Sequence, residues 1–207
     1  PKTYKKNDLY FESDIKKVFV VKPISELTNA KVLYLTKHEI LDSKLINTKD
    51  FLIQDYINGS GLGFFAIYDH GYLKSFFMHR RIRENPITGG SSVCAESIFS
   101  QKLFDYGTKL LEELNWHGVA MVEFKEDSLN NEFYLMEVNP KFWASHDLSI
   151  VSGINFAEKY LEINPYKKTI YKKVDNKIKY KINNKFQWLA RDISSSFFRP
   201  TRLLKVF

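Results

Sequence analysis

Short apolar runs separated by polar residues make up the first part of the chain, a pattern that is typical of strands. "VFVVKP" (18–23), "KVLYLT" (31–36) and "FLIQDYI" (51–57) are rich in β-branched and aromatic residues, and each is predicted to be a strand. Between the last two, residues 38–46 carry apolar side chains at helical spacing. The pattern therefore predicts a small α+β lobe over residues 1–57.

A second α+β lobe is predicted over residues 58–163. "FFAIYDHGYLKSFFMHRR" contains two aromatic-rich runs around the turn signal "DHG", which indicates a β-hairpin. Helical spacing then runs from Ser100, a favourable N-cap, to Trp116, and residues 155–163 form a last predicted helix. "VAMVEF" and "FYLMEVN" are separated by a polar stretch, so we expect them to pair as an antiparallel hairpin.

The charge of the chain is distributed unevenly. The net charge is +7, but residues 164–207 hold 12 Lys and Arg against two acids, so residues 1–163 hold 19 basic and 22 acidic residues. A slightly acidic body makes nucleic acid an unexpected partner. Residues 164–207 are predicted to be a basic C-terminal extension with a helical segment in "FQWLARDISSSF". The extension is expected to be solvated or docked on a lobe, and the alternative is that it binds an anionic partner.

Composition limits the class of protein further. At 207 residues with 44% apolar residues, the chain is long enough to bury a core. No apolar run approaches the roughly 20 residues that span a bilayer, and no signal segment is evident. A single cysteine, Cys94, requires no oxidising compartment. We therefore expect a cytoplasmic protein without a membrane span, and because the sequence begins with proline we expect a piece of a longer protein.

The end of the last predicted hairpin brings two acidic side chains together. If the loop is centred near Asn130, Glu123 lies opposite Glu137, and Asn139 shares the face of Glu137 because strand side chains alternate. Opposed like charges destabilise a sheet, and a divalent cation would relieve the repulsion. A valine lies next to each glutamate, Val122 before Glu123 and Val138 after Glu137, so neither carboxylate is expected to be bathed in water. Two carboxylates and an amide suit magnesium or manganese. The alternative is two solvated acids at a strand end.

Three basic side chains are candidates for binding an anion. Lys22 ends a strand, where it could hold a phosphate or simply extend along the strand edge. Arg81 and Arg83 lie two residues apart and are expected to share one strand face, followed by a loop whose Gly89 and Gly90 allow close approach to an anion. A solvated run of charges is the alternative for the arginines.

Other familiar motifs fail on context or spacing. "NGSGLG" is followed by an alternating aromatic strand rather than a helix, so we expect a hinge or turn rather than a dinucleotide site. The five histidines lack HExxH spacing, and each is expected to be structural or to lie at the surface. No G-x-S-x-G elbow supports a hydrolase.

The order of these pieces is more specific than any one of them. A strand ending in Lys-Pro, then "IQDYI", an arginine-rich strand, "WHGVAMVEF" and "YLMEVNPKFW" resemble the ATP-grasp superfamily over residues 1–162. Within it, the chain is most similar to the carbamoyl-phosphate-synthase-like branch of predicted carboxylate-amine ligases. The resemblance implies two α+β lobes whose antiparallel sheets clasp ATP. It also implies an N-terminal domain of the same protein that precedes this chain.

The resemblance assigns roles by position in the motifs. Magnesium on the ATP phosphates would be held by Glu123, Glu137 and Asn139. A substrate carboxylate or its acyl phosphate would be oriented by Arg81 and Arg83, with Lys141 facing the same group at a position where relatives commonly have arginine. The expected nucleotide contacts are Lys22 on the phosphates and Gln54, Asp55, Tyr56 and Ile57 along the adenine.

The resemblance also has departures. Lysine at position 141 keeps the charge but loses the two-pronged grip of arginine on a carboxylate. "PISELTNAKV" after Lys22 has no glycine, whereas many relatives fold a glycine-rich loop over the phosphates. The leading hypothesis is an ATP- and magnesium-dependent ligase for small carboxylate and amine substrates. The alternative is a non-catalytic ATP-grasp-like domain that binds a nucleotide or a partner, and a third hypothesis gives the main role to the basic extension.

Overall fold

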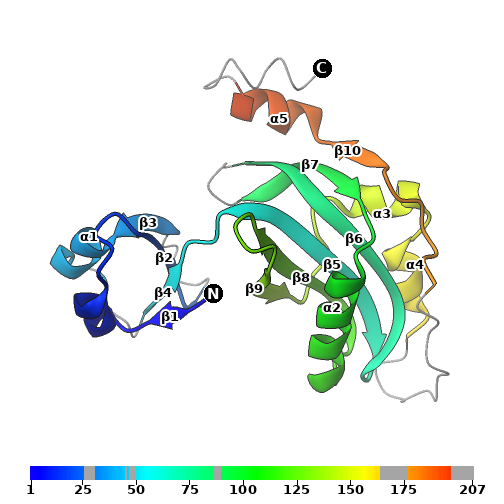
Figure 1. Ribbon diagram of the computed structural model, residues 1–207. Helices are drawn as coiled ribbons and strands as arrows, with labels where there is room; N and C mark the ends of the chain where they lie inside the picture. The colour runs from blue at the N-terminus through cyan, green and yellow to red at the C-terminus, as the bar shows by residue number, and fades with distance from the viewer. Residues whose placement is uncertain (26–30, 45, 47–49, 86–89, 164–176, 197–207) are drawn as a thin grey trace. The chain divides into compact units, whose positions relative to one another are not determined.

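The chain folds into two compact units, Pro1–Asn58 and Gly59–Phe207 (Figure 1). The structure is a computed structural model, and it describes residues 1–25, 31–44, 46, 50–85, 90–163 and 177–196. Among these residues, none of the helices has the length and apolar composition needed to cross a lipid bilayer. The two units are described separately below.

The first unit is built on a four-stranded antiparallel sheet in the order β1-β4-β2-β3. Phe19, Val21, Ile40 and Ile53 are fully buried and form its core. Thr36 begins the helix, and its backbone amide and hydroxyl both donate hydrogen bonds to Oε2 of Glu39, at 2.7 and 2.8 Å. The elements are β1 (Thr3–Tyr4), η1 (Lys6–Phe11), β2 (Val18–Pro23), β3 (Leu33–Thr36), α1 (Lys37–Asp42) and β4 (Phe51–Asp55).

The predicted elements of this unit are present, but three are shorter than predicted. β3 begins at Leu33 and β4 ends at Asp55, two residues inside the predicted runs 31–36 and 51–57. The helix predicted over residues 38–46 ends at Asp42, because the backbone of Ser43 is already extended. Ile46 is nevertheless buried in the core, which explains why its apolar side chain continued the helical spacing.

The second unit is built on a six-stranded antiparallel sheet in the order β10-β7-β6-β5-β8-β9. Two long, curved strands, β5 and β6, form its middle (Figure 1). The strands are β5 (Gly59–Asp69), β6 (Tyr72–Asn85), β7 (Ser91–Ser97), β8 (Gly118–Asp127), β9 (Phe133–Asn139) and β10 (Lys185–Gln187). The helices are α2 (Gln101–Glu113), α3 (His146–Ser152), α4 (Phe156–Leu161) and α5 (Leu189–Ser196).

Aromatic side chains of β5 point alternately to the two faces of this sheet. Phe64 packs edge-on against Phe104 of α2, with the ring centroids 6.2 Å apart. Its neighbour Phe65 points to the other face and contacts Trp143 at 4.2 Å, and Trp143 in turn packs against Phe156 of α4. α2 therefore covers one face of β5, and Trp143 together with α4 covers the other.

Gly107 marks a close contact between α2 and the sheet. A Cβ atom on Gly107 would lie 2.3 Å from Cδ1 of Phe64, which is fully buried. Alanine normally stabilises a helix interior by about 1 kcal/mol over glycine, but overpacking costs about 1–3 kcal/mol. We therefore expect Gly107→Ala to lower the free energy of unfolding in urea, whereas Lys109→Ala on the exposed face of α2 should change it little. A stabilised Gly107→Ala variant would contradict this packing.

Residues 177–196 of the basic extension dock on the second unit. β10 pairs with β7, and Tyr180 donates a hydrogen bond of 2.6 Å to the carbonyl of Ile98. The helix predicted in this part of the chain is α5. The rest of the predicted extension, residues 164–176 and 197–207, and Gly89 of the predicted anion-binding loop lie outside the described residues.

Candidate metal and phosphate site

The hairpin of β8 and β9 places Glu123 directly opposite Glu137, and Met121 opposite Asn139. The predicted pairing of the two glutamates is thereby confirmed. Asn139 is buried, and its Nδ2 donates hydrogen bonds to Oε1 of Glu137 at 2.7 Å and to Oε1 of Glu123 at 3.3 Å. The three side chains predicted to bind metal therefore converge at the end of one hairpin.

The two glutamates differ in exposure. Only 14% of the Glu123 side chain is exposed, whereas Glu137 is exposed on the edge strand β9. The expectation that neither carboxylate would be bathed in water is therefore wrong for Glu137, because β9 is the last strand of the sheet. Burial, and then the charge of Glu137, raise the pKa of Glu123 above the ordinary range for glutamate, against the opposing effect of Arg81.

Arg81 of β6 supplies a positive charge beside the glutamates. Its Nη2 lies 2.5 Å from Oε2 of Glu123, and its Nη1 lies 3.2 Å from Oε1 of Glu84 and donates to the carbonyl of Gly90. The Arg81 side chain is 12% exposed. A nearly buried guanidinium held by two carboxylates has a fixed position, which is what the recognition of an anion requires.

Glycine on β5 makes room for this guanidinium. A Cβ atom on Gly61 would lie 2.8 Å from both Cδ of Arg81 and Oε1 of Glu84. The glycines of "NGSGLG" lie within β5 and do not form the expected turn. At Gly61, the missing side chain lets Arg81 extend across the strand towards β8.

The three oxygen-bearing side chains fit a magnesium ion. Adjacent ligands of an octahedral magnesium ion lie about 2.9 Å apart, since each is 2.0–2.1 Å from the metal. The 2.7 and 3.3 Å contacts of Asn139 bracket this spacing. The oxygen and nitrogen of an asparagine carboxamide are assigned from its hydrogen bonds alone. Rotating the Asn139 carboxamide by half a turn would place Oδ1 where Nδ2 lies. Glu123, Glu137 and Asn139 could then hold the ion with oxygen ligands only.

Arg83 has separate partners from Arg81. The register of β6 against β7 shifts between the two arginines, which interrupts the alternation of side chains. Arg83 forms a two-pronged ion pair with Asp192 of α5, with Nε–Oδ2 and Nη2–Oδ2 distances of 2.8 and 2.5 Å. The expectation that the two arginines share one strand face and act together is therefore not met.

Two further polar side chains near this site were not singled out from the sequence. Lys125 follows Glu123 by two residues and lies opposite Gly61, and burial, followed by the charge of Arg81, lowers its pKa against the opposing effect of Glu84. His79 lies opposite Gly63 and is 1% exposed, and burial followed by Arg81 lowers its pKa well below the ordinary range. The sequence did hold a signal for both residues. Lys125 lies two positions after Glu123 and His79 two positions before Arg81, and residues two apart on a strand share a face.

The predicted nucleotide contacts lie in the first unit. Lys22 is on β2 opposite Leu52, and Gln54 donates a hydrogen bond of 3.0 Å from Nε2 to Oγ1 of Thr3. Tyr56 is exposed and Ile57 is buried, both just after β4.

Asp55 at the end of β4 has a different environment. Its Oδ1 accepts a hydrogen bond of 2.9 Å from the hydroxyl of Tyr4 and lies 2.9 Å from Nζ of Lys17. Its backbone amide donates to the carbonyl of Lys2. The Asp55 side chain therefore stabilises the first unit.

In the second unit Lys141, two residues after Asn139, is exposed.

Solved structures with a similar fold identify the architecture. The biotin carboxylase domain of *Hydrogenobacter thermophilus* 2-oxoglutarate carboxylase, in complex with MgADP, ADP and bicarbonate, matches 87% of this chain and 42% of that chain, with a TM-score of 0.63 and 14% identity. Campylobacter jejuni biotin carboxylase, in a β-γ-ATP complex, matches 83% of this chain and 41% of its own chain, with a TM-score of 0.61 and 16% identity. Bacillus licheniformis L-amino acid ligase matches 78% of this chain and 41% of its own chain, with a TM-score of 0.58 and 16% identity.

The chain has an ATP-grasp fold. The expected α+β class with antiparallel sheets is confirmed. No protein-family model and no curated protein matches the sequence. The chain spans about 42% of the first of these ATP-grasp structures, and at this level of identity the likeness concerns the fold rather than the reaction.

Proposed function

We propose that the chain is the core of an ATP- and magnesium-dependent ligase that joins a small carboxylate to an amine. The observation that carries the proposal is the opposed pair Glu123 and Glu137, joined by Asn139 and flanked by Arg81, on the sheet of an ATP-grasp fold. Such a set combines oxygen ligands for a divalent ion with a fixed cation, and phosphoryl transfer depends on both.

The proposed reaction has two steps. A carboxylate oxygen of the substrate attacks the γ-phosphorus of ATP, the bond to the bridging oxygen breaks, and ADP leaves, which forms an acyl phosphate. The amine then attacks the acyl carbon, inorganic phosphate leaves, and the amine nitrogen loses a proton. Bound magnesium would neutralise charge on the phosphates.

The side chains of the second unit would take distinct parts in this reaction. Glu123, Glu137 and Asn139 would hold the ion. Arg81 would orient the carboxylate or the acyl phosphate, since the carboxylates beside it fix its position. Lys141, which is exposed, would be a further contact for the same anionic group. For Arg83, the ion pair with Asp192 favours a structural part over the expected catalytic one.

The nucleotide contacts are proposed from the resemblance alone. They are Lys22 on the phosphates and Gln54, Asp55, Tyr56 and Ile57 on the adenine, the last four through backbone groups. The backbone amide of Asp55 donates to the carbonyl of Lys2, and Tyr56 and Ile57 follow the end of β4.

Structures with the same fold support the class of substrates. Among them are an L-amino acid ligase from *Bacillus licheniformis* and an N5-carboxyaminoimidazole synthetase from *Staphylococcus aureus*. We propose that this chain likewise uses ATP with magnesium or manganese, and that its substrates are a small carboxylate and an amine.

Calorimetry tests the proposal. We expect ATP to bind the chain in the presence of magnesium and to bind at least about tenfold more weakly when EDTA removes the ion, since the ion offsets the charge of the phosphates. The protein that contains this chain should then release ADP only when a suitable carboxylate and amine are both present, which a screen of amino-acid and carboxylate pools would detect. Failure of ATP to bind with magnesium would contradict the proposal.

The ion pair between Arg81 and Glu123 supports a second candidate. Because Arg81 already offsets the charge of Glu123, the hairpin end can be stable as a polar cluster that does no chemistry. A non-catalytic nucleotide- or partner-binding domain would bind ATP without any acceptor-dependent release of ADP. The same screen therefore separates the two functions.

A further inference from the structure

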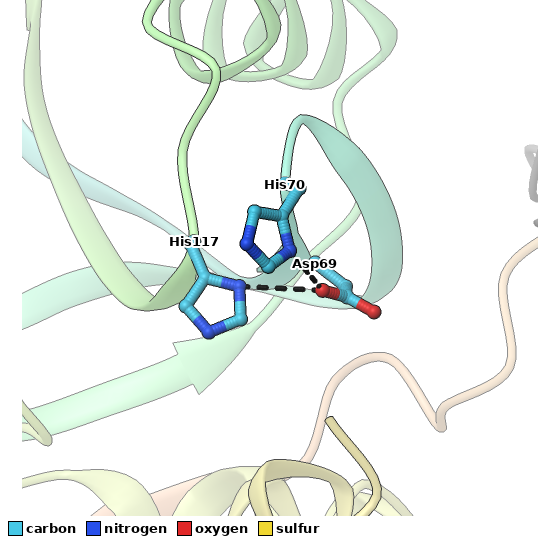
Figure 2. Close-up of side chains that lie close together, drawn as sticks. All are labelled: Asp69, His70 and His117. Carbon is cyan, nitrogen blue, oxygen red and sulfur yellow. Dashed lines mark hydrogen bonds and ion pairs between the residues drawn. The ribbon is translucent and has the colours of Figure 1, made fainter. Parts of the chain in front are cut away.

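Asp69, His70 and His117 form a cluster on the second unit that the proposed function does not use. Asp69 ends β5, His70 follows it in the turn to β6, and His117 directly precedes β8 (Figure 2). One potential ligand atom from each lies within 4.8 Å of the other two. The cluster combines two imidazoles and a carboxylate, which are typical ligands of transition metals.

Both imidazoles present the same nitrogen to one carboxylate oxygen. Nδ1 of His70 lies 2.6 Å, and Nδ1 of His117 3.3 Å, from Oδ1 of Asp69, as the dashed lines in Figure 2 show. The two rings are side by side, with centroids 4.2 Å apart. The Asp69 carboxylate is 0% exposed, whereas the two imidazoles are 28% and 29% exposed. The ligand atoms therefore converge beside a buried carboxylate, and Nδ1 of His117 is itself buried although its ring is partly exposed.

Backbone contacts hold the two segments in place. The amide of Gly71 donates a hydrogen bond of 2.8 Å to the carbonyl of Trp116, which ties the β5–β6 turn to the residue before His117. His70 itself has a φ of 47°, and Gly71 and Gly118 have φ values of 81° and 94°. The chain therefore turns sharply at His70 and directly after each of the two histidines. The arrangement is therefore formed by the fold and needs little rearrangement to bind an ion.

We propose that Asp69, His70 and His117 bind a zinc ion that ties the β5–β6 turn to the start of β8. Two ligand atoms of a tetrahedral zinc ion, each 2.0–2.1 Å from the metal, lie about 3.3 Å apart. The distance from Nδ1 of His117 to Oδ1 of Asp69 has this value, and the contact of His70 needs to open by less than an ångström. A water molecule would fill the fourth position.

This site differs in chemistry from the candidate magnesium site. Imidazole nitrogens select zinc and related transition metals, whereas the set around Glu137 offers carboxylate and amide groups. The zinc would act on the stability of the second unit, because an ion that binds only the folded chain raises its melting temperature. The proposal does not depend on ATP binding or on catalysis.

A competition titration tests the site directly. Protein without a polyhistidine tag, stripped with EDTA and dialysed, is titrated with Zn²⁺ against a chromophoric chelator. We expect one zinc ion per chain at this site and a melting temperature that rises with added Zn²⁺. His117→Ala should weaken binding at least about tenfold, since even partners outside the ligand set cost 10- to 100-fold. Two controls should bind zinc normally: His38→Ala at an exposed position of α1, and Glu137→Gln at the magnesium site.

Cobalt gives a second measurement that needs no variant. Co²⁺ substitutes for zinc, and its visible absorption is intense in tetrahedral sites and weak in octahedral ones. The unmodified chain should show the tetrahedral spectrum, and Zn²⁺ should abolish it. The absence of zinc binding, equal affinities of the unmodified chain and a folded His117→Ala variant, or an octahedral cobalt spectrum alone would overturn the proposal.

Discussion

Replacing Glu137 with glutamine should reduce magnesium-dependent ATP turnover at least about 100-fold. Loss of a metal ligand costs at least as much as the 10- to 100-fold loss seen for partners that merely orient ligands. Glu137 is exposed on an edge strand, so the variant removes one charge from the site without creating a cavity. The free energy of unfolding should therefore stay within about 0.5 kcal/mol of the original value, as for other surface substitutions.

The matched control for this variant is Glu126→Gln. Glu126 lies on the same hairpin, opposite Phe133 and three positions beyond Glu123, so regular alternation directs it to the other face of β8. Initial rates of ADP release, measured over a range of magnesium concentrations, should be normal for Glu126→Gln and strongly reduced for Glu137→Gln. Equal magnesium dependence in both variants would show that Glu137 does not bind the ion.

Replacing Asp192 with alanine should lower the free energy of unfolding by about 3–5 kcal/mol, because it leaves a largely buried cation without its counter-charge. Asp192 is 0% exposed and Arg83 is 13% exposed, and Asp192 also accepts a hydrogen bond from Gln187 of β10. The pair therefore connects β6, β10 and α5. Urea unfolding followed by tryptophan fluorescence would measure the loss.

A double variant distinguishes a structural from a catalytic part for Arg83. Combining Arg83→Met with Asp192→Leu replaces the ion pair by apolar side chains of similar size, which is often neutral for stability. We expect it to recover most of the stability that Asp192→Ala loses. If the recovered protein also keeps its activity, Arg83 acts through the packing of α5. A stable but inactive double variant would show that Arg83 takes part in the reaction.

Local pairing could be predicted from the sequence. The opposition of Glu123 and Glu137 was found by counting residues on either side of a short loop. The pairs nearer the loop, such as Glu126 with Phe133, lie one residue off that count, and a register shift between Glu123 and Phe124 restores it, which the sequence did not indicate. The predicted cap Ser100 begins α2, and Asn155, the first residue of the last predicted helix, caps α4, because a cap depends on atoms only two or three residues away.

Long-range pairing could not be predicted in this way. Arg83 and Asp192 are separated by 109 residues, and the shift of register between Arg81 and Arg83 leaves no mark in the local pattern. Asp69 and His117 come from two segments that only the folded sheet brings together. Strand β7, "SSVCAES", was missed because its side chains are small and form no strongly apolar pattern, although most of them are buried and α3 and α5 contact the strand.

The pairing of β10 with β7 also bears on the solubility of the protein. Without Lys185–Gln187, the backbone amides and carbonyls on that side of β7 would form an open edge able to recruit strands from other molecules. β10 is only three residues long and begins with a lysine, which makes it a poor template for further growth of the sheet. This short segment of the basic extension thus protects the β7 side of the sheet from edge-to-edge aggregation.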